Sequence, residues 1–222
     1  MARIIDENFE GTGYEETWAE TIDAGCTLDE DSVLPGSAPY PVGAGSQCLK
    51  AIVLDATYAD AYALQTKTNQ NISYIRGYVY LSEEGLADNQ YFYSFVLADG
   101  ASAVVSRIQI AQISGVLNVR FSYYSNSAIQ NTAFTNISLN TWYRIEYKYD
   151  ITNLLWEWRI NGVLRNSGSL VANTRTPQKL LIGIQFNIGV AQSTLYTDLV
   201  VWDDAAWVGG ELSIPIARRR GR

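Results

Sequence analysis

Paired carboxylates on one strand could catalyse the hydrolysis of a glycosidic bond. A retaining glycoside hydrolase needs a nucleophile and an acid whose carboxyl groups lie about 5 Å apart. On a strand, that spacing requires carboxylates at alternating positions. Glu146 and Glu157 are each followed on the same face by a basic residue, and the adjacent pair Asp203-Asp204 points to opposite faces. The pattern therefore predicts no catalytic carboxylate pair.

A polysaccharide lyase is the other enzyme that these residue types could build. It removes a proton next to a carboxylate with a general base, which is often His. The chain has no His but has 15 Tyr, so only a mechanism with Tyr as the base stays open. The missing His also argues against zinc chemistry. We therefore expect a protein without enzymatic activity and assign no catalytic residue.

The distribution of charge limits the partners of this chain. The formal net charge of the 222 residues is -7, although the last five residues hold four of the 16 basic side chains. The rest of the chain, with 12 basic and 23 acidic residues, is near -11. Such an acidic body repels nucleic acid and anionic membranes, so we expect neither as a partner.

Two cysteines, Cys26 and Cys48, leave two alternatives open. As a disulfide, they would close a loop of about 20 residues and add roughly 3 kcal/mol to stability. As two buried thiols, they would behave as small apolar residues. The segment between them, residues 24–45, contains the acidic run Asp29, Glu30 and Asp31 and three prolines, and it predicts a long surface loop.

Exposed aromatic rings would suit a sugar, because a ring covers the apolar side of a pyranose. Tyr91 and Tyr93 alternate on a predicted strand with Phe95 and Leu97, and this pattern predicts that all four face the core. The aromatic residues that remain near loops, and that we expect to contact any ligand, are Tyr123, Tyr124 and Trp207.

The strands that must position these residues are clearest in residues 139–165. Apolar and polar residues alternate from 142 to 149 and again from 154 to 160, as in strands with one wet face. Trp156 and Trp158 share a face with Leu154 and Ile160, so we expect all four in the core. The dipeptide at 161–162, Asn-Gly, then predicts a two-residue hairpin with a type I′ turn.

Similar alternating segments recur along the chain, separated by Gly, Asn, Asp or Ser. Roughly a dozen strands at this spacing, with no segment at helical spacing, predict an all-β fold, a two-sheet antiparallel jelly-roll sandwich. We expect one domain over residues 1–210 and an extension over 211–222. The N-terminus lacks the pattern of a secretory signal, and no apolar run is long enough to cross a bilayer.

Short motifs resemble those of the concanavalin A-like lectin/glucanase superfamily, most of all its laminin-G-like jelly rolls. They are listed here in chain order: Phe9-Glu10-Gly11, Trp142-Tyr143-Arg144-Ile145, Trp158 with Asn161-Gly162-Val163, and Tyr196-Thr197-Asp198-Leu199-Val200-Val201. The family includes lectins, glycan-binding modules, lyases, glucanases and phage structural proteins, so the resemblance implies a fold and leaves several functions open.

The same resemblance implies a structural Ca²⁺. In related glycan-binding modules, an N-terminal Phe-Glu and an Asp near the C-terminus hold the ion, and Glu10 and Asp198 match those positions. Calcium takes six or more oxygen ligands, so backbone carbonyls at 11–13 would have to contribute. The family often has paired acids before its last strand, whereas Thr197 precedes Asp198 here. Two ordinary surface carboxylates are the alternative.

We interpret the chain as a non-enzymatic surface-binding or structural protein. A lectin-like fold without a secretion signal favours a phage virion component, such as a capsid decoration, tail or fibre-associated protein, made in the cytoplasm and exposed outside cells. A carbohydrate-binding lectin-like module is the alternative, and a lyase or glycoside hydrolase is the third possibility.

The C-terminus carries the residues that we expect to bind another subunit. Its apolar residues alternate around a proline, which cannot donate a ladder hydrogen bond, so the segment suits an edge strand added to a neighbour's sheet. A basic cluster follows and could pair with that neighbour's carboxylates. The residues predicted to contact the partner are Leu212, Ile214, Ile216, Arg218, Arg219, Arg220 and Arg222.

Overall fold

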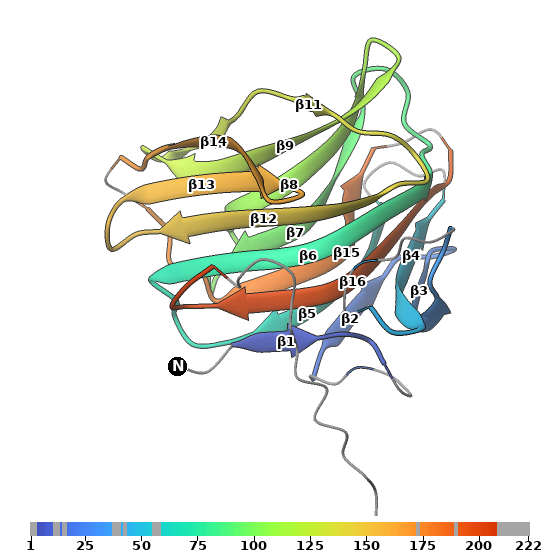
Figure 1. The fold of residues 1–222 in the computed structure, drawn as a ribbon, viewed down its shortest axis with the longest axis horizontal. Helices are drawn as coiled ribbons and strands as arrows, with labels where there is room; N and C mark the ends of the chain where they lie inside the picture. The colour runs from blue at the N-terminus through green and yellow to red at the C-terminus, as the bar shows by residue number, and fades with distance from the viewer. Residues whose placement is uncertain are drawn as a thin grey trace, which may run out of the picture.

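The computed structural model describes residues 4–10, 14, 17–36, 41, 44–54, 59–171, 174–188 and 191–207. Within these residues it contains strands and no helix, in two antiparallel sheets of eight strands each that pack as the layers of a sandwich (Figure 1). This confirms the predicted all-β sandwich. The described residues form sixteen strands, more than the dozen expected from the sequence.

The first sheet contains the hairpin that the sequence marked most clearly. Its order is β14 (Val163–Ser169), β13 (Leu155–Ile160), β12 (Trp142–Asp150), β6 (Ile72–Glu83), β16 (Ser193–Asp203), β4 (Gln47–Val53) and β3 (Thr27–Val33), with β1 (Ile5–Glu7) paired to β16.

The second sheet lies against the first across the core. Its order is β10 (Ala128–Asn131), β9 (Val116–Ser125), β8 (Val104–Ile113), β7 (Tyr91–Ala98), β15 (Lys179–Asn187), β5 (Ala59–Thr66) and β2 (Ala19–Ile22), with β11 (Thr135–Asn136) paired to β9.

Apolar side chains from both sheets meet in one main core between the layers. Aromatic residues fill much of it, because each large ring buries much apolar surface. The largest fully buried aromatic side chains are Trp158, Trp202, Tyr147, Tyr149, Phe9, Phe92, Phe95 and Phe121.

The predicted hairpin is confirmed. Ile160 pairs with Val163, and the two residues between them have φ angles of +52° and +77°, as a type I′ turn requires. Trp156 and Trp158 are buried as expected. Leu154 is the exception: its φ is +55°, it lies in the turn before β13, and 38% of its side chain is exposed.

The prediction of a loop over residues 24–45 is wrong for its first half. Residues 27–33 form β3, which pairs with β4. Leu28 packs against the core, and Asp29 stands opposite Lys50, a cross-strand pair of opposite charges. The acidic run therefore belongs to a strand, and its first residue stands opposite a basic residue of the neighbouring strand.

The register of the same two strands rules out the disulfide. Cys48 is paired with Ser32, whereas Cys26 precedes Thr27, which is paired with Ile52. The two cysteines therefore lie near opposite ends of β4, roughly 13 Å or more apart at about 3.3 Å per residue. A disulfide needs Cα atoms within about 7 Å of each other. Both residues are buried free thiols, which was the second alternative.

A bulge in β7 overturns the prediction that Tyr91 and Tyr93 face the core. Ser94 pairs with Ile108 and Leu97 with Ser106, so two residues of β7 stand against one of β8. This shift reverses the alternation between its two sides. Phe95 and Leu97 point into the core, while Tyr91 and Tyr93 lie with Val96 and Ala98 on the outer face of the sheet.

Two contacts hold this bulge. The hydroxyl of Tyr147, from the first sheet, donates a hydrogen bond of 2.8 Å to the carbonyl oxygen of Phe95, whose φ is +45°. The ring of Phe95 lies over Gly77 of β6, where an added Cβ would stand 2.4 Å from the ring. Only glycine at position 77 leaves room for this ring.

No described segment forms a helix long and apolar enough to span a membrane. The predicted extension over 211–222 lies outside the described residues.

Replacing Trp158 with Ala is expected to lower the free energy of unfolding by about 3 to 5 kcal/mol, because truncation of a fully buried aromatic leaves a cavity. Only 1% of Trp158 is exposed. Denaturant unfolding monitored by circular dichroism would measure the loss. Leu155→Ala, on the wet face of the same strand, is the control and should change stability by less than about 0.5 kcal/mol. A similar loss for both variants would show that the two faces of β13 are assigned wrongly.

Candidate functional site

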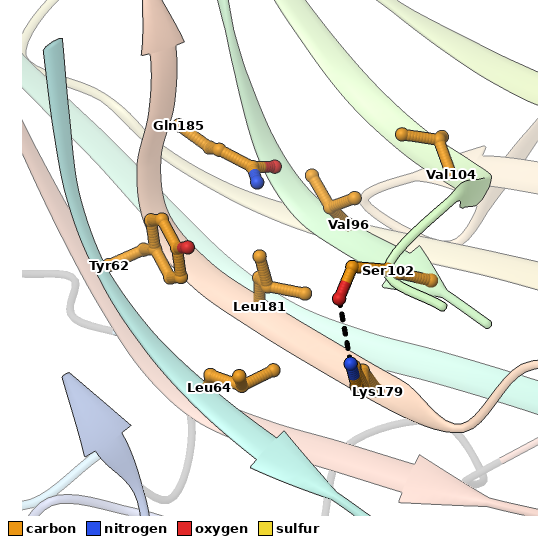
Figure 2. A pocket seen from close by; sticks show the side chains of 9 residues that line it. Tyr62, Leu64, Val96, Ser102, Val104, Lys179, Leu181 and Gln185 are labelled. Atoms are coloured by element: carbon orange, nitrogen blue, oxygen red, sulfur yellow. Dashed lines mark hydrogen bonds between the residues drawn. The ribbon is translucent and has the colours of Figure 1, made fainter. Parts of the chain in front are cut away.

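A groove crosses the outer face of the second sheet and is formed by β5, β15, β7 and β8. Its larger cavity has a volume of about 340 Å³, which lies within the range of sites for small ligands. A smaller cavity of about 70 Å³ adjoins it and shares Val104 and Gln185 with it (Figure 2). We call the two cavities together the outer groove. The larger cavity is lined by Asp60, Tyr91, Tyr93, Val104, Arg107, Gln185 and Phe186.

An aromatic shelf forms one wall of the larger cavity. The ring of Phe186 is 38% exposed and stacks nearly parallel on Tyr91 and Tyr93, with centroid distances of 6.4 and 5.7 Å. A bulge at the end of β15, where Phe186 has a φ of +56°, turns this ring outward. The shelf therefore depends on two bulges, one in β7 and one in β15.

Arginine side chains lie beside this shelf. The guanidinium carbon of Arg107 stands 3.6 Å from the ring centre of Tyr93. On the next strand, Arg120 donates from Nε to Gln109 Oε1 at 2.9 Å and lies 4.3 Å from the ring centre of Phe134. Neither arginine makes a salt bridge to an acidic residue in the described part of the chain.

The smaller cavity is apolar at its floor and polar at its rim. Figure 2 shows Tyr62 and Leu64 of β5 facing Leu181 of β15 across it. At the rim, Lys179 Nζ donates to Ser102 Oγ at 2.7 Å and to the carbonyl oxygen of Gly100 at 3.1 Å. The ammonium group is thus held by neutral oxygens.

One acidic residue, Asp60, lines the groove. One carboxylate oxygen accepts a hydrogen bond of 2.5 Å from the backbone N–H of Phe186, and Oδ2 of Asp23 accepts one of 2.8 Å from the N–H of Asp60. Burial raises the pKa of Asp60, the bond from Phe186 lowers it, and the charge of Asp23 raises it further. This carboxylate fixes the outward turn of Phe186.

Tyr93 of the groove is a poor base. Burial raises the pKa of Tyr93, and its contact with Tyr91 raises it further, although the charge of Arg107 acts in the opposite direction. The phenol therefore stays protonated at neutral pH and can donate a hydrogen bond, but it cannot take up a proton.

The three aromatic residues predicted to contact a ligand are only partly exposed and do not come together. Tyr123 stacks on Trp156 at 4.4 Å, against the core. Trp207 lies on the first sheet, 5.2 Å from the ring of Tyr74. Tyr124 alone faces the groove's side of the second sheet, where the guanidinium of Arg175 lies 3.8 Å from its ring centre. Arg175 also donates to the carbonyl oxygen of Val104, which lines the groove.

Sequence reasoning missed the residues that line the larger cavity. The bulges that expose Tyr91, Tyr93 and Phe186 leave no trace in the alternation of the sequence. A usable signal did exist on β8, where Arg107 and Gln109 alternate within an otherwise apolar segment. Polar side chains at every second position of a central strand indicate a polar outer face.

A second cluster of functional interest lies at the predicted calcium ligands. Asp198 is fully buried, and its Oδ2 has no hydrogen-bond partner. Burial raises its pKa to about 8; the backbone N–H of Leu199 acts in the opposite direction, and the charges of Glu10 and Glu7 raise the pKa further. Glu10 Oε1 accepts hydrogen bonds from the N–H groups of Ser46 and Gln47, at 2.6 and 2.8 Å.

These residues fit a cation only in part. An unpaired carboxylate oxygen surrounded by negative charge is the environment that a bound cation would relieve. Within the described residues, however, no group of three or more Cys, Asp or Glu side chains is close enough to hold a metal ion. Calcium bound by Glu10 and Asp198 would take its other ligands from backbone oxygens or water. It would neutralise Asp198 and stabilise the fold.

The sequence matches no protein-family model and no curated protein. Among solved structures, it is similar to Cip1, a cellulose-induced protein, with a TM-score of 0.70 at 14% identity over 93% of this chain and 99% of that one. The globular domain of T. cruzi calreticulin has a TM-score of 0.61 at 10% identity, over 92% and 89% of the two chains.

A third similar structure is the ligand-binding domain of botulinum neurotoxin serotype D in complex with N-acetylneuraminic acid, with a TM-score of 0.61 at 12% identity. The matched region includes 95% of this chain but only 48% of the neurotoxin domain. At such identities, the likeness shows the fold alone. The jelly-roll, lectin-like sandwich implied by the sequence motifs is confirmed.

Asp198 should make stability depend on pH and calcium. Its folded pKa of about 8 lies above the ordinary value of 3.8, so the folded chain holds this proton more tightly than the unfolded chain does. Without calcium, the melting temperature should therefore fall as the pH rises from about 4 to about 8 and then level off. Calcium competes with the proton, so it should raise the melting temperature more at pH 8 than at pH 5.

Scanning calorimetry in chelator and in calcium would measure both responses. Asp198→Asn should abolish them, whereas Asp203→Asn on the same strand should keep them. A melting temperature at pH 8 that is the same in excess chelator and in calcium would remove the metal site.

Proposed function

We propose that the chain is a carbohydrate-binding module without enzymatic activity and that the outer groove is its binding site. The observation that carries this proposal is the exposed ring of Phe186 beside Arg107 and Gln185 in a cavity of about 340 Å³. An aromatic ring covers the apolar side of a pyranose, while Arg, Gln and phenol groups supply the hydrogen bonds that hydroxyl groups need.

The similar structures support this proposal. The neurotoxin structure, of which the match covers 48%, is a ligand-binding domain in complex with N-acetylneuraminic acid, a sugar, and Cip1 is named for its induction by cellulose. Fold likeness does not transfer a ligand, so the argument rests on the groove itself.

The absence of enzymatic activity is supported by the residues of the groove. Asp60 is the one acidic residue among those that line it, whereas a glycoside hydrolase needs two. A lyase with Tyr as its base would need a lowered pKa, and the pKa of Tyr93 is raised. Incubation with alginate and laminarin should release neither reducing ends nor unsaturated products, and either product would contradict this part of the proposal.

Phe186→Ala should weaken saccharide binding about fivefold or more, because stacking on an aromatic ring contributes roughly 1 kcal/mol or more. A glycan array would find the ligand, and isothermal titration calorimetry would measure its affinity. Leu164→Ala, a similarly apolar side chain that is 52% exposed on β14, is the matched control and should bind as the parent chain does. A flat array across neutral and acidic sugars would contradict the proposal.

We further propose that this module is a component of a phage virion. The residue-level argument for this role is the C-terminal segment that begins at Leu212 and ends in Arg222, and that segment lies outside the described residues. The expected partners are other protein subunits, and the expected location is a virion or extracellular surface. A gene position among capsid or tail genes would support this role.

Deleting residues 212–222 should leave the melting temperature of the chain unchanged and should weaken its assembly with other subunits in a salt-dependent way. Size-exclusion chromatography with light scattering at low and high salt would measure assembly. Replacing only the four terminal arginines with Ser separates the charged part of the attachment from its apolar part. If the deletion unfolds the chain, the segment belongs to its own sheet.

A further inference from the structure

Three basic residues of the first sheet are paired with carboxylates two residues away, whereas those around the outer groove have few such pairs. On the first sheet, Arg144, Lys148 and Arg159 each lie within 4.0 Å of a carboxylate, and these pairs are Arg144–Glu146, Lys148–Asp150 and Arg159–Glu157. On the second sheet, four basic residues surround the outer groove: Arg107, Arg120, Arg175 and Lys179. Only Arg175 among them approaches a described carboxylate, that of Asp99, at 4.0 Å.

Arg107 and Arg120 form a pair of cations that no carboxylate in the described part of the chain neutralises. Arg107 is paired with Ser122 and Arg120 with Gln109, so the two arginines are diagonal neighbours on β8 and β9. Such neighbours have Cα atoms about 7–8 Å apart. Burial lowers the pKa of Arg120, the neighbouring Tyr93 raises it, and the positive charge of Arg107 lowers it.

The contacts of the two arginines orient them without neutralising them. Each guanidinium lies on an aromatic ring, that of Tyr93 or of Phe134. Arg120 donates to the neutral amide of Gln109, and Nε of Arg107 is buried without a hydrogen-bond partner. Partly buried charges that lack an anion are costly, whereas a bound anion would offset that cost.

The position of the pair points to the ligand. Arg107 lines the larger cavity beside the aromatic shelf, so an anion there would belong to a molecule that also stacks on Phe186. Asp60 lies on the opposite side of that cavity, and its carboxylate accepts a backbone hydrogen bond from Phe186. It therefore does not neutralise Arg107, and an anion can approach this arginine. A planar guanidinium matches a carboxylate with two parallel hydrogen bonds.

We infer that the outer groove selects carboxylated saccharides, of the uronic or sialic acid type, and that Arg107, supported by Arg120, binds the carboxylate while Phe186 stacks on the sugar ring. This inference rests on the proposed function and names its ligand class. The net charge of -7 would make this binding specific, because the acidic body repels polyanions in general. Only an anion that reaches Arg107 and Arg120 would bind.

Calorimetric titration with matched pairs of ligands tests this inference. The probes are oligogalacturonate, oligoglucuronate, alginate oligomers and sialyllactose, each compared with its carboxyl-reduced, neutral counterpart. At least one acidic member should bind about tenfold or more tightly than its counterpart, and the preference should weaken with added salt. Sulfated counterparts form a further arm, in which binding of sulfated sugars alone would overturn the assignment to carboxylates.

Arginine variants locate the effect. Arg107→Gln and, separately, Arg120→Gln should abolish the acidic preference while leaving the melting temperature within a few degrees of that of the parent chain. Arg159→Gln, on the first sheet, is the control and should keep the preference. If a neutral member binds as tightly as its acidic partner, the inference fails and the proposed function stands. If no saccharide of either kind binds, the proposed function itself fails.

Discussion

The hydrogen bond from Tyr147 to the carbonyl oxygen of Phe95 is the contact on which the face of the second sheet depends. It joins the two sheets across the core and satisfies a carbonyl group that the bulge in β7 removes from the ladder. The ring of Phe95 enters the core over Gly77. Because the bulge reverses the alternation of β7 after Ser94, Phe95 points inside while Tyr91 and Tyr93 lie outside. There, the two tyrosines form the base of the aromatic shelf.

The two outer faces then differ in charge. On the first sheet, three basic side chains are paired with carboxylates two residues away on the same strand, which partly cancels the charge there. The second sheet carries arginines that rest on aromatic rings, which orient a guanidinium and do not cancel its charge. A chain of net charge -7 thus carries a pair of arginines beside the groove, and the proposed selectivity rests on this contrast.

The lectin-like sandwich is shared with proteins as different as Cip1, calreticulin and a neurotoxin domain, at identities of 10–14%. Such a fold tolerates this divergence because its core requires only alternating apolar residues on two sheets. Bulges and outward-facing side chains can change without cost to the core, and in this chain they form the groove. The buried Asp198 is a separate feature, since it lies on β16 of the first sheet and does not line the groove.

The sequence by itself determined the local and periodic features: the all-β class, the hairpin at 161–162, and the burial of Trp156 and Trp158. These depend on alternation and turn residues, which act between close neighbours in the chain. Tertiary structure alone decided the outward position of Tyr91, Tyr93 and Phe186, the pairing of Asp29 with Lys50, and the separation of Cys26 from Cys48. Each depends on register between strands that are distant in sequence, and a bulge of one residue reverses the faces of every residue that follows it.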